Sequence, residues 1–323
     1  MDKILFSIGI PAFKDVFLKK CIQSILNQTY TNFELIIVND CSPQDLSSIV
    51  KKFDDERIKY FENEKNVGAK EVVKNWNKCL EHATGDFFVL MGDDDLMAKD
   101  YLYEFASLIQ KHPDLDVYHC RTMIIDENDE PVKLTSSWPE YENVYDNIWH
   151  RLTERRSQYI SDFVYRTEHL KKEKGFFYLP LAWGSDDISA YRASGTKGIA
   201  HTNKALFKYR SNSYSITSTG NLELKMHATK DYFIWLSEFL ERTKPNSIGE
   251  VILYNHLNSN IIKYKKEKQN IFIRKAIRNK MFLRTLKLIT KRKKIDIHIW
   301  QIIICFINVT TDVIKNKLIK SSL

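Results

Sequence analysis

Residues 4–38 read ILFSIGIPAFKDVFLKKCIQSILNQTYTNFELIIV. The stretch begins with an apolar run, 4–10, that is typical of a buried strand and that Pro11 would end. Apolar residues then recur at helical spacing over 18–26, and a second apolar run follows at 33–38. A strand, a helix and a strand in this order predict two parallel strands joined by a crossover helix.

The same alternation continues to about residue 112. We expect strands at 57–63 and 86–91, and helices at 68–85 and 99–112. Segments of these lengths predict an α/β fold with a mostly parallel, doubly wound sheet flanked by helices. In such sheets the ligand binds beyond the carboxyl ends of the strands, so residues that directly follow the strands are the first candidates for a functional site.

Three aspartates, Asp93–Asp95, follow Gly92 at the end of the strand expected at 86–91. Acids at a helix N-terminus interact well with the helix dipole, but a single Asp would serve that purpose. Three neighbouring carboxylates repel one another unless a cation or several hydrogen-bond donors face them. We therefore favour a Mn²⁺ or Mg²⁺ site, in which one or two carboxylates and the phosphates of a ligand hold the metal.

Other acids occupy comparable positions. Asp40, in the turn after the second strand, could form an Asx turn or accept a hydrogen bond from a nucleobase N–H, and the two interpretations are equally supported. Asp186–Asp187 begin a helical segment, where they could cap the helix or supply a general base. Trp183 could line a sugar site, although burial in the core is the default for such a residue.

Two familiar nucleotide-binding motifs are absent from the sequence. No G-x-G-x-x-G follows the first strand, and no G-x-x-x-x-G-K-[ST] occurs anywhere. Their absence argues against a dinucleotide-dependent dehydrogenase and against a P-loop kinase or NTPase. A bound nucleotide diphosphate would need another source of positive charge, for which a metal on Asp93–Asp95 is the candidate.

The net charge of +8 is unevenly distributed along the 323 residues. From residue 250 onward there are 17 Lys and Arg against 4 Asp and Glu, whereas the remainder has 32 against 37. Residues 221–323 are expected to be mainly helical, and 261–294 carry 14 basic residues and one acid. The apolar segment 297–314 is too short and too interrupted to span a bilayer, but it could form an interfacial helix.

The basic tail allows three interpretations. It could be a solvated helix docked on the body, or it could be attracted to an anionic membrane surface, at about 1 kcal/mol per basic residue near the lipid. Binding to nucleic acid is the third, but no recognised motif supports it, so no nucleic-acid partner is expected. We take membrane attraction through residues 261–323 as a hypothesis.

The cysteines and the N-terminus suggest a compartment. Five scattered cysteines without a C-x-x-C pair make a disulfide framework or a structural zinc site improbable. The apolar run 4–10 is shorter than the apolar region of a secretory signal. We therefore expect a cytoplasmic protein, associated with the inner face of the cytoplasmic membrane if the tail binds lipid.

Two segments carry a resemblance to a known family. Residues 7–45, SIGIPAFKDVFLKKCIQSILNQTYTNFELIIVNDCSPQD, and 63–97, NEKNVGAKEVVKNWNKCLEHATGDFFVLMGDDDLM, resemble the family 2 glycosyltransferases of GT-A fold. The resemblance is dense over roughly the first 110 residues. It continues more weakly through LAWGSDDIS (181–189) and YRSNSYSITS (209–218) to about residue 218.

The resemblance implies a GT-A catalytic domain at 1–220, with a nucleotide-binding half at about 1–112 and an acceptor half at about 113–220. Residues 221–323 would then be a helical, basic C-terminal extension. It also implies direct displacement at the anomeric carbon with inversion. By the same resemblance, the nucleotide would be bound by Pro11, Ala12, Phe13, Asp40, Asn66, Asp93 and Arg210, and the metal by Asp94 with Asp93 or Asp95, with Asp186 or Asp187 as the base. Trp183, from the aromatic segment before Asp186, is the candidate for binding the acceptor.

The sequence departs from the family pattern in three places. The acidic motif is often Asp-x-Asp-Asp, and here Gly92 stands at its first position, which leaves Asp94 as the favoured metal ligand. Cys41 stands where the family commonly has glycine. The motif of the base is usually Glu-Asp. Matching it through Gly184 favours Asp186, whereas matching the acidic pair favours Asp187, and the register stays open.

The function expected on these grounds is metal-dependent, inverting transfer of a hexose or N-acetylhexosamine from a nucleotide-diphosphate donor, with a UDP-sugar favoured. The acceptor would be a glycan or lipid-linked glycan in surface polysaccharide biosynthesis. The alternative is a non-catalytic GT-A-like binding or partner subunit, for which Gly92 in the acidic motif is the one point of support.

Overall fold

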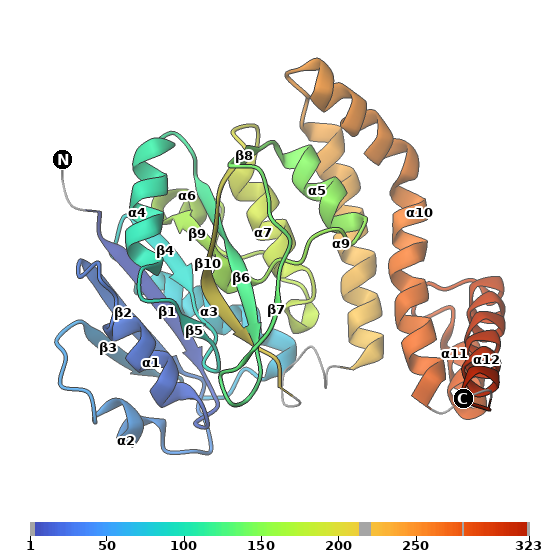
Figure 1. Cartoon of the computed structure of the whole chain (residues 1–323), viewed down its shortest axis with the longest axis horizontal. Helices are drawn as coiled ribbons and strands as arrows, with labels where there is room; N and C mark the ends of the chain where they lie inside the picture. The colour runs from blue at the N-terminus through green and yellow to red at the C-terminus, as the bar shows by residue number, and fades with distance from the viewer. Residues whose placement is uncertain (1–3, 213–220, 280, 322–323) are drawn as a thin grey trace.

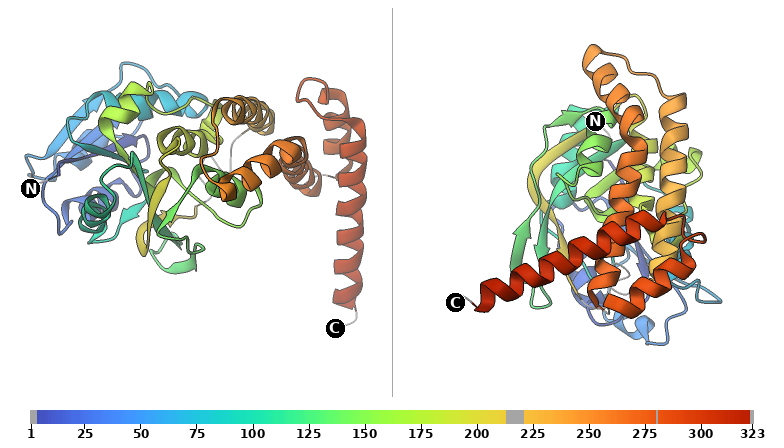
Figure 2. Two further views of the ribbon diagram at one scale, coloured as in Figure 1. Left: turned by 90° about the horizontal axis from the view of Figure 1, so that it is seen from above. Right: turned by 90° about the vertical axis from the view of Figure 1, so that its right-hand side faces the viewer.

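The computed structural model describes residues 4–212, 221–279 and 281–321. The chain forms a sheet covered by helices on both faces, and a group of long C-terminal helices packs against one side of it (Figure 1). Figure 2 gives the same arrangement from two further directions. The resemblance that extends weakly to residue 218 ends outside the described residues.

The sheet is parallel in its first half and mixed in its second. In spatial order its main path is β3-β2-β1-β4-β9-β6-β10-β5, with β7 beside β6 and β8 beside β10. Strands β1 to β4 pair in parallel, whereas β9, β7, β8 and β5 pair antiparallel with their neighbours. The bounds are β1 (Phe6–Ala12), β2 (Phe33–Asn39), β3 (Ile58–Glu62), β4 (Phe87–Leu90), β5 (Leu96–Met97), β6 (Val117–Ile125), β7 (Pro131–Leu134), β8 (Tyr141–Glu142), β9 (Phe163–Arg166) and β10 (Ile199–Arg210).

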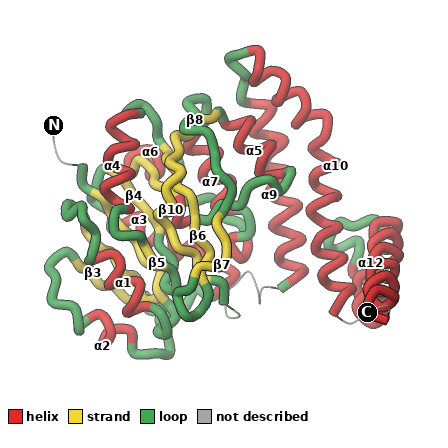
Figure 3. Tube along the Cα trace, viewed as in Figure 1, coloured by secondary structure: helices red, strands yellow, loops and turns green. Residues whose placement is uncertain are grey.

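The helices alternate with the strands in the first two-thirds of the chain, and the described part of the C-terminal third is helical, as Figure 3 shows. Their bounds are α1 (Leu18–Leu26), α2 (Leu46–Val50), α3 (Val72–Glu81), α4 (Tyr101–Lys111), α5 (Val144–Leu152), α6 (Thr167–Lys172), α7 (Ser185–Ser194), α9 (Leu222–Arg242), α10 (Ile248–Asn279), α11 (Met281–Lys291) and α12 (Ile299–Ser321). Three short 3₁₀ turns add η1 (Ala69–Glu71), η2 (Ile160–Asp162) and η3 (Pro180–Ala182).

The two faces of the sheet have separate cores. In β2, Leu35 and Ile37 join the core that contains the buried face of α1, whereas Ile36 and Val38 join the core that contains the buried face of α3. Side chains alternate between the faces of a strand, so a strand covered on both sides is apolar throughout. This covering confirms the α/β fold expected from the sequence.

Two local expectations were wrong. Pro11 does not end β1, which runs on to Ala12 and stays paired with β2. The Pro11 nitrogen faces the β4 side, where the pairing ends at Gly9, so the missing N–H breaks no ladder bond. Helix α3 ends at Glu81 and not at Gly85. Gly85 is instead required by close packing, since a Cβ there would lie 2.6 Å from the carbonyl oxygen of Leu5.

The C-terminal helices are attached to the body by two apolar clusters. One cluster joins α9 and α10 to α5 and α7, through residues such as Tyr232, Leu257 and Ile148. The other joins α10, α11 and α12 and reaches the body at Trp183. Helix α12 lies farthest from the sheet (Figures 1 and 2). The division near residue 220 stays a prediction, because α9 and α10 share a core with the preceding helices.

Within the described ranges, no helix combines the length and the apolar character that crossing a bilayer requires. The cysteines Cys21, Cys41, Cys79, Cys120 and Cys305 are all unpaired thiols.

Candidate active site

The acidic triplet follows β4 and faces the loop that follows β1. The Oδ2 atom of Asp93 accepts hydrogen bonds from the backbone nitrogens of Phe13, at 2.8 Å, and Lys14, at 2.7 Å. Burial raises the pKa of Asp93, although the Lys14 charge opposes the rise. This carboxylate therefore fixes the loop after β1 against the triplet.

Asp94 faces cationic and amide groups. Its Oδ2 atom lies 2.6 Å from the ammonium nitrogen of Lys14 and accepts a hydrogen bond of 2.8 Å from the Asn212 side chain. Burial alone would lower the pKa of Lys14, but the carboxylates of Asp93 and Asp94 raise it. The Lys14 side chain is one-third exposed, so a positive group approaches this carboxylate from the solvent side.

Asp95 points the other way, into the body of the protein. Its Oδ1 atom accepts a hydrogen bond of 2.7 Å from the backbone nitrogen of Arg210. Burial and the neighbouring Asp94 charge raise its pKa well above the ordinary value. A Cβ on Gly92 would lie 2.6 Å from Asp95 Oδ2, so a side chain at this position would force the Asp95 carboxylate to shift.

Arg210 lies beneath the triplet and is fully buried. Its guanidinium donates to the carbonyl oxygens of Asp94 and Asp126, and it pairs with Asp129 at 2.6 Å. The carbon of the guanidinium also lies 4.2 Å from the ring centre of Phe17. These contacts make Arg210 a support for the triplet and a poor candidate for contact with phosphates.

Asp40 follows β2 and organises a second loop. Its Oδ1 atom accepts from the side chain of Asn63, at 2.9 Å, and from the backbone nitrogen of Val67, at 3.0 Å. Asn66 donates to the backbone carbonyl of Asp40 at 2.8 Å. No described residue donates to Oδ2 of Asp40, so this oxygen is left for a ligand.

The donor set around the triplet fits a divalent cation in part. Within the described residues, no three His, Cys, Asp or Glu side chains converge as a metal cluster. Mn²⁺ and Mg²⁺ in nucleotide sites need only one or two carboxylates besides phosphates. Asp94 meets that need best, because it is only partly buried, whereas Asp93 and Asp95 are buried and accept hydrogen bonds from backbone nitrogens.

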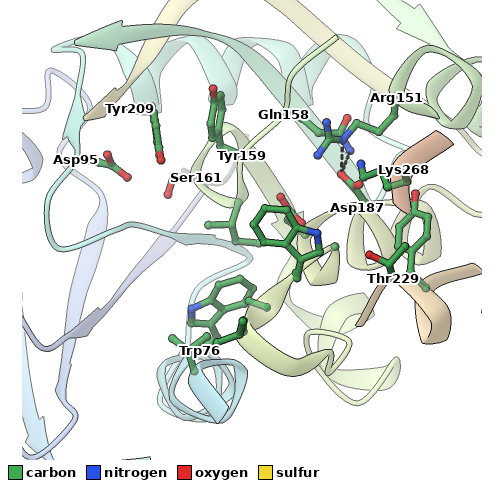
Figure 4. Close-up of a pocket in the computed structure, with 18 of the residues that line it drawn as sticks. Trp76, Asp95, Arg151, Gln158, Tyr159, Ser161, Asp187, Tyr209, Thr229 and Lys268 are labelled. Carbon is green, nitrogen blue, oxygen red and sulfur yellow. Dashed lines mark hydrogen bonds and ion pairs between the residues drawn. The ribbon is translucent and has the colours of Figure 1, made fainter. Parts of the chain in front are cut away.

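A pocket of about 300 Å³ connects the triplet to the second acidic pair (Figure 4). Asp95 lies at one end, and Arg151, Asp187 and Lys268 lie together at the other. The wall between them is largely aromatic and aliphatic, with a few polar side chains. The pocket is lined by Val72, Trp76, Asp95, Arg151, Gln158, Tyr159, Ile160, Ser161, Leu181, Ala182, Trp183, Gly184, Asp186, Asp187, Phe207, Tyr209, Thr229, Tyr232, Phe233 and Lys268.

The two members of the second acidic pair have different environments. Asp187 is buried, and its Oδ1 atom accepts 2.8 Å hydrogen bonds from Arg151 and from Gln158. Asp186 is half-buried, and no described side chain forms a hydrogen bond or ion pair with it. Burial in the pocket wall and the Asp187 charge raise the pKa of Asp186 to about 7, against the influence of Arg151.

Trp183 lies in the pocket wall and also belongs to the packing of the tail. Its ring meets Phe272 of α10 edge-on, with the ring centres 5.5 Å apart. The Lys225 ammonium lies 4.5 Å from the centre of the Trp183 ring. The sequence left open whether Trp183 lines a sugar site or belongs to the core. Its position is compatible with both, since it borders the pocket and packs against the C-terminal helices.

The loop before Asp186 has an unusual backbone. Leu181 and Ala182 adopt φ angles of 62° and 52°, which residues other than glycine rarely do, and Gly184 follows at 93°. Such conformations cost free energy and persist only where the surroundings enforce them, as they often do at functional sites. The loop places Trp183 and the N-terminus of α7 in the pocket.

We expect Gly184→Ala to destabilise the protein by about 1–3 kcal/mol, because the added Cβ would have a strained φ and lie 2.8 Å from the Tyr232 ring. Gly249→Ala is the matched control, because nothing lies within 4 Å of a Cβ there. Urea unfolding followed by circular dichroism would compare the two. Equal midpoints for both variants would show that the loop accommodates a side chain.

Several residues of the site gave no signal in the sequence. Arg151 and Gln158 come from the segment around α5, and no spacing links them to Asp187. Lys268 was counted only as one charge of the basic tail. Tyr159 and Tyr209 stack in the pocket wall with ring centres 4.3 Å apart. They are distant in the sequence, so only the tertiary structure reveals this pair.

Comparison with known proteins gives a family match. The model described as glycosyl transferase family 2 matches residues 7–174. Glycosyltransferase GlyA of Streptococcus pneumoniae is 27% identical over 254 residues, which is 71% of this chain and 33% of that protein. The GalNAc(5)-diNAcBac-PP-undecaprenol beta-1,3-glucosyltransferase of Campylobacter jejuni is 36% identical over 108 residues, or 32% of this chain and 33% of that protein.

Solved structures show a similar fold. TarS of S. aureus (residues 1–349) in complex with UDP matches with a TM-score of 0.61 at 18% identity, over 97% of this chain and 92% of that one. The mannosyltransferase PcManGT of Pyrobaculum calidifontis, in complex with GDP-Man and Mn²⁺, matches with a TM-score of 0.54 at 15% identity, over 97% and 87%. The chain spans about a third to two-fifths of the length of the first curated relatives that it matches.

Proposed function

The chain belongs to glycosyl transferase family 2 and is a glycosyltransferase of GT-A fold, and on this premise we propose that it transfers a sugar from a nucleotide diphosphate with inversion. The acceptor would be a hydroxyl group of a glycan or of a lipid-linked glycan. The observation that carries the proposal is the pocket that joins the triplet, at Asp95, to the Asp186–Asp187 pair. Donor and acceptor need such adjacent positions for direct displacement.

We assign the donor nucleotide to the loops after β1 and β2. Pro11, Ala12 and Phe13 would border the base and ribose, and Asp93 holds this segment in place through two backbone hydrogen bonds. Oδ2 of Asp40 would accept from a nucleobase N–H, with Asn66 fixing the Asp40 loop. A UDP-sugar is the favoured donor, in keeping with the UDP named in the TarS complex.

We assign the metal to Asp94, with Asp93 or Asp95 as its neighbour in the motif. PcManGT, a structural relative, is named as a complex with Mn²⁺ and a nucleotide sugar, which supports the same cofactor here. When bound, Mn²⁺ or Mg²⁺ supplies positive charge to the departing diphosphate. The Lys14 ammonium, 2.6 Å from Asp94, occupies a cation position beside that carboxylate and would have to move for the metal to bind there.

We assign the general base to Asp186. A base works best when its pKa lies near the working pH, and burial and Asp187 bring that of Asp186 to about 7. Asp186 would accept the proton of the acceptor hydroxyl as the oxygen attacks the anomeric carbon. Asp187 would orient the site, because Arg151 and Gln158 hold its carboxylate. Trp183 would bind the acceptor sugar from the pocket wall.

A nucleotide and a metal should raise the thermal stability of the protein together. We expect one of UDP, GDP and CMP to shift the melting temperature only when Mn²⁺ is present. A ligand at about 100 times its Kd adds roughly 2.7 kcal/mol to the free energy of unfolding, which is readily measured. Differential scanning fluorimetry of each nucleotide with and without Mn²⁺ tests this. Absence of a shift with every nucleotide, in folded protein, would contradict the proposal.

The non-catalytic alternative rested on Gly92 as a sign of decay in the acidic motif. The close approach of Asp95 Oδ2, 2.6 Å from a Cβ built at this position, gives a packing reason for glycine there instead. The carboxylates that the reaction needs are all present and border one pocket or the loop beside it. Named relatives are glycosyltransferases, which agrees with an enzyme.

We further propose that the tail contacts an anionic membrane surface, where a lipid-linked acceptor would lie. Residues 291–294, KRKK, lie four residues before α12, and Lys291 and Lys294 of this cluster pair with Glu223. Helix α12 packs on α10 with Ile302, Cys305 and Val309. Its other side leaves apolar side chains exposed, among them Trp300, at 62%, and Ile304 and Ile307, both at 54%. Exposed apolar residues next to a basic cluster suit an interfacial helix.

Flotation with vesicles tests the membrane proposal on the full chain. We expect the protein to float with vesicles containing anionic lipid at low salt, and Ile304→Ser/Ile307→Ser to reduce the floated fraction several-fold. Ile248→Ser/Ile252→Ser is the control, because these residues are also exposed but lie at the start of α10. Recovery of the unmodified protein in the soluble fraction would argue against membrane contact.

A further inference from the structure

Lys268 of α10 belongs to the wall of the pocket, at the end formed by Asp186 and Asp187 (Figure 4). It comes from the C-terminal helices, whereas the other charged residues of the wall come from the body. Helix α10 is held in this position by contacts with α5 and α9, including the buried side chains of Leu257 and Tyr264. The placement of Lys268 in the pocket is therefore a fixed feature of the packing.

The ammonium group of Lys268 makes no hydrogen bond or ion pair with any described residue. The neighbouring lysine on the same helix, Lys265, pairs with Asp296 at 2.7 Å. Asp187, a carboxylate in the same part of the pocket wall, already accepts hydrogen bonds from Arg151 and Gln158. Half-buried ammonium groups generally find a partner, so an unpartnered one in a pocket points to a ligand.

The charges at this end of the pocket change during the proposed reaction. Burial lowers the pKa of Lys268, and the Arg151 charge lowers it further. The carboxylates of Asp187, Glu154 and Asp186 oppose these effects, and of these only Asp187 and Asp186 line the pocket. When Asp186 accepts the proton of the acceptor, its carboxylate becomes neutral. Asp187 then balances Arg151, and the Lys268 charge has no counterpart in the wall. An anion on the acceptor would supply that counterpart.

We propose that Lys268, with Arg151 beside it, binds a phosphoryl group of the acceptor. This inference rests on the proposed function, because it takes the Asp186 end of the pocket as the acceptor end. The donor diphosphate is assigned to the triplet at the opposite end, where Asp95 lies, so the two anionic groups would not compete. Charge-assisted hydrogen bonds from ammonium and guanidinium groups are the usual means of binding phosphate. The C-terminal helices would thus take part in selecting the acceptor.

Binding of small sugars to the full chain, saturated with UDP and Mn²⁺, tests the proposal. N-acetylglucosamine 1-phosphate is the phosphorylated probe, and methyl N-acetylglucosaminide is its neutral counterpart. Trp76 and Trp183 line the pocket, so tryptophan fluorescence can report binding without any turnover. We expect the phosphorylated probe to bind at least about tenfold more tightly than the neutral one.

Variants locate the source of this preference. Lys268→Met should abolish it, Lys268→Arg should retain most of it, and Lys266→Met, an exposed residue on the same helix, should leave it unchanged. UDP binding should be equal in all three variants. A preference that survives in Lys268→Met, or none in the unmodified protein, would overturn the proposal. Equal binding of methyl glucuronide would overturn the assignment to phosphate. Failure of UDP itself to bind would instead reject the proposed function, and this inference with it.

Discussion

Asp186→Asn should lower kcat by about 10²–10⁴-fold, because removal of a general base typically has an effect of that size. Binding of the nucleotide should not change, since Asp186 lies at the acceptor end of the pocket. Asparagine is nearly isosteric and keeps the start of α7 intact. Initial rates with a radiolabelled nucleotide sugar, together with the thermal shift given by UDP and Mn²⁺, would separate chemistry from binding.

Dependence on pH provides an independent signature of the same residue. The base must be deprotonated to act, so kcat/KM should rise with pH through the pKa of Asp186, about 7, and fall away below it. Asp187→Asn removes the like charge that raises this pKa, so the rise should move to lower pH. If Asp186→Asn kept a near-normal rate and Asp187→Asn lost activity, Asp187 would be the general base instead of Asp186.

Asp94→Ala should remove the dependence of nucleotide binding on Mn²⁺ and lower kcat/KM by on the order of 100-fold or more. A metal that balances the charge of the leaving diphosphate supplies several kcal/mol, and each 1.4 kcal/mol corresponds to a tenfold change in rate. Chelation of the metal with EDTA should have the same effect on the unmodified protein. Calorimetric titration of UDP with and without Mn²⁺ measures the binding effect directly.

The neighbouring acids make this prediction specific. Asp114→Asn, an exposed position beyond α4, should leave binding and rate unchanged. Asp93→Asn should weaken nucleotide binding but leave its dependence on Mn²⁺ in place, because the Asp93 carboxylate fixes the backbone of Phe13 and Lys14. A Mn²⁺ response that persists in Asp94→Ala and disappears in Asp95→Asn would place the metal on the buried carboxylate.

The first half of the fold could be predicted from the sequence because its signals are local. Each parallel strand is a short apolar run, and each crossover helix has its own periodic face, as in 18–26. The second half depends on pairings between distant segments. Strand β9, for example, lies between β4 and β6 and pairs antiparallel with both, and no local sequence pattern predicts that arrangement.

The same difference between local and long-range signals applies to the candidate site. Asp93–Asp95 and Asp186–Asp187 could be identified from the sequence because acids cluster at the ends of elements. Their individual roles could not, because these depend on which donor each carboxylate meets. Asp93 meets backbone nitrogens, Asp94 meets Lys14, and Asp187 meets Arg151. The contact of Arg210 with phosphate stays a prediction, and the sequence did not indicate its buried partners because they come from two loops distant in the chain.

The wall of the pocket extends along the chain from Val72 to Lys268. During synthesis on a ribosome, strands β1 to β3 could pair early, because their contacts are close in sequence. The pocket between Asp95 and Asp187 would be completed only after α10 has emerged and docked on α5. On the proposed assignment, a nascent or proteolytically shortened chain that ends before residue 268 would hold a nucleotide without a complete acceptor site, and we expect such a chain to have no transfer activity.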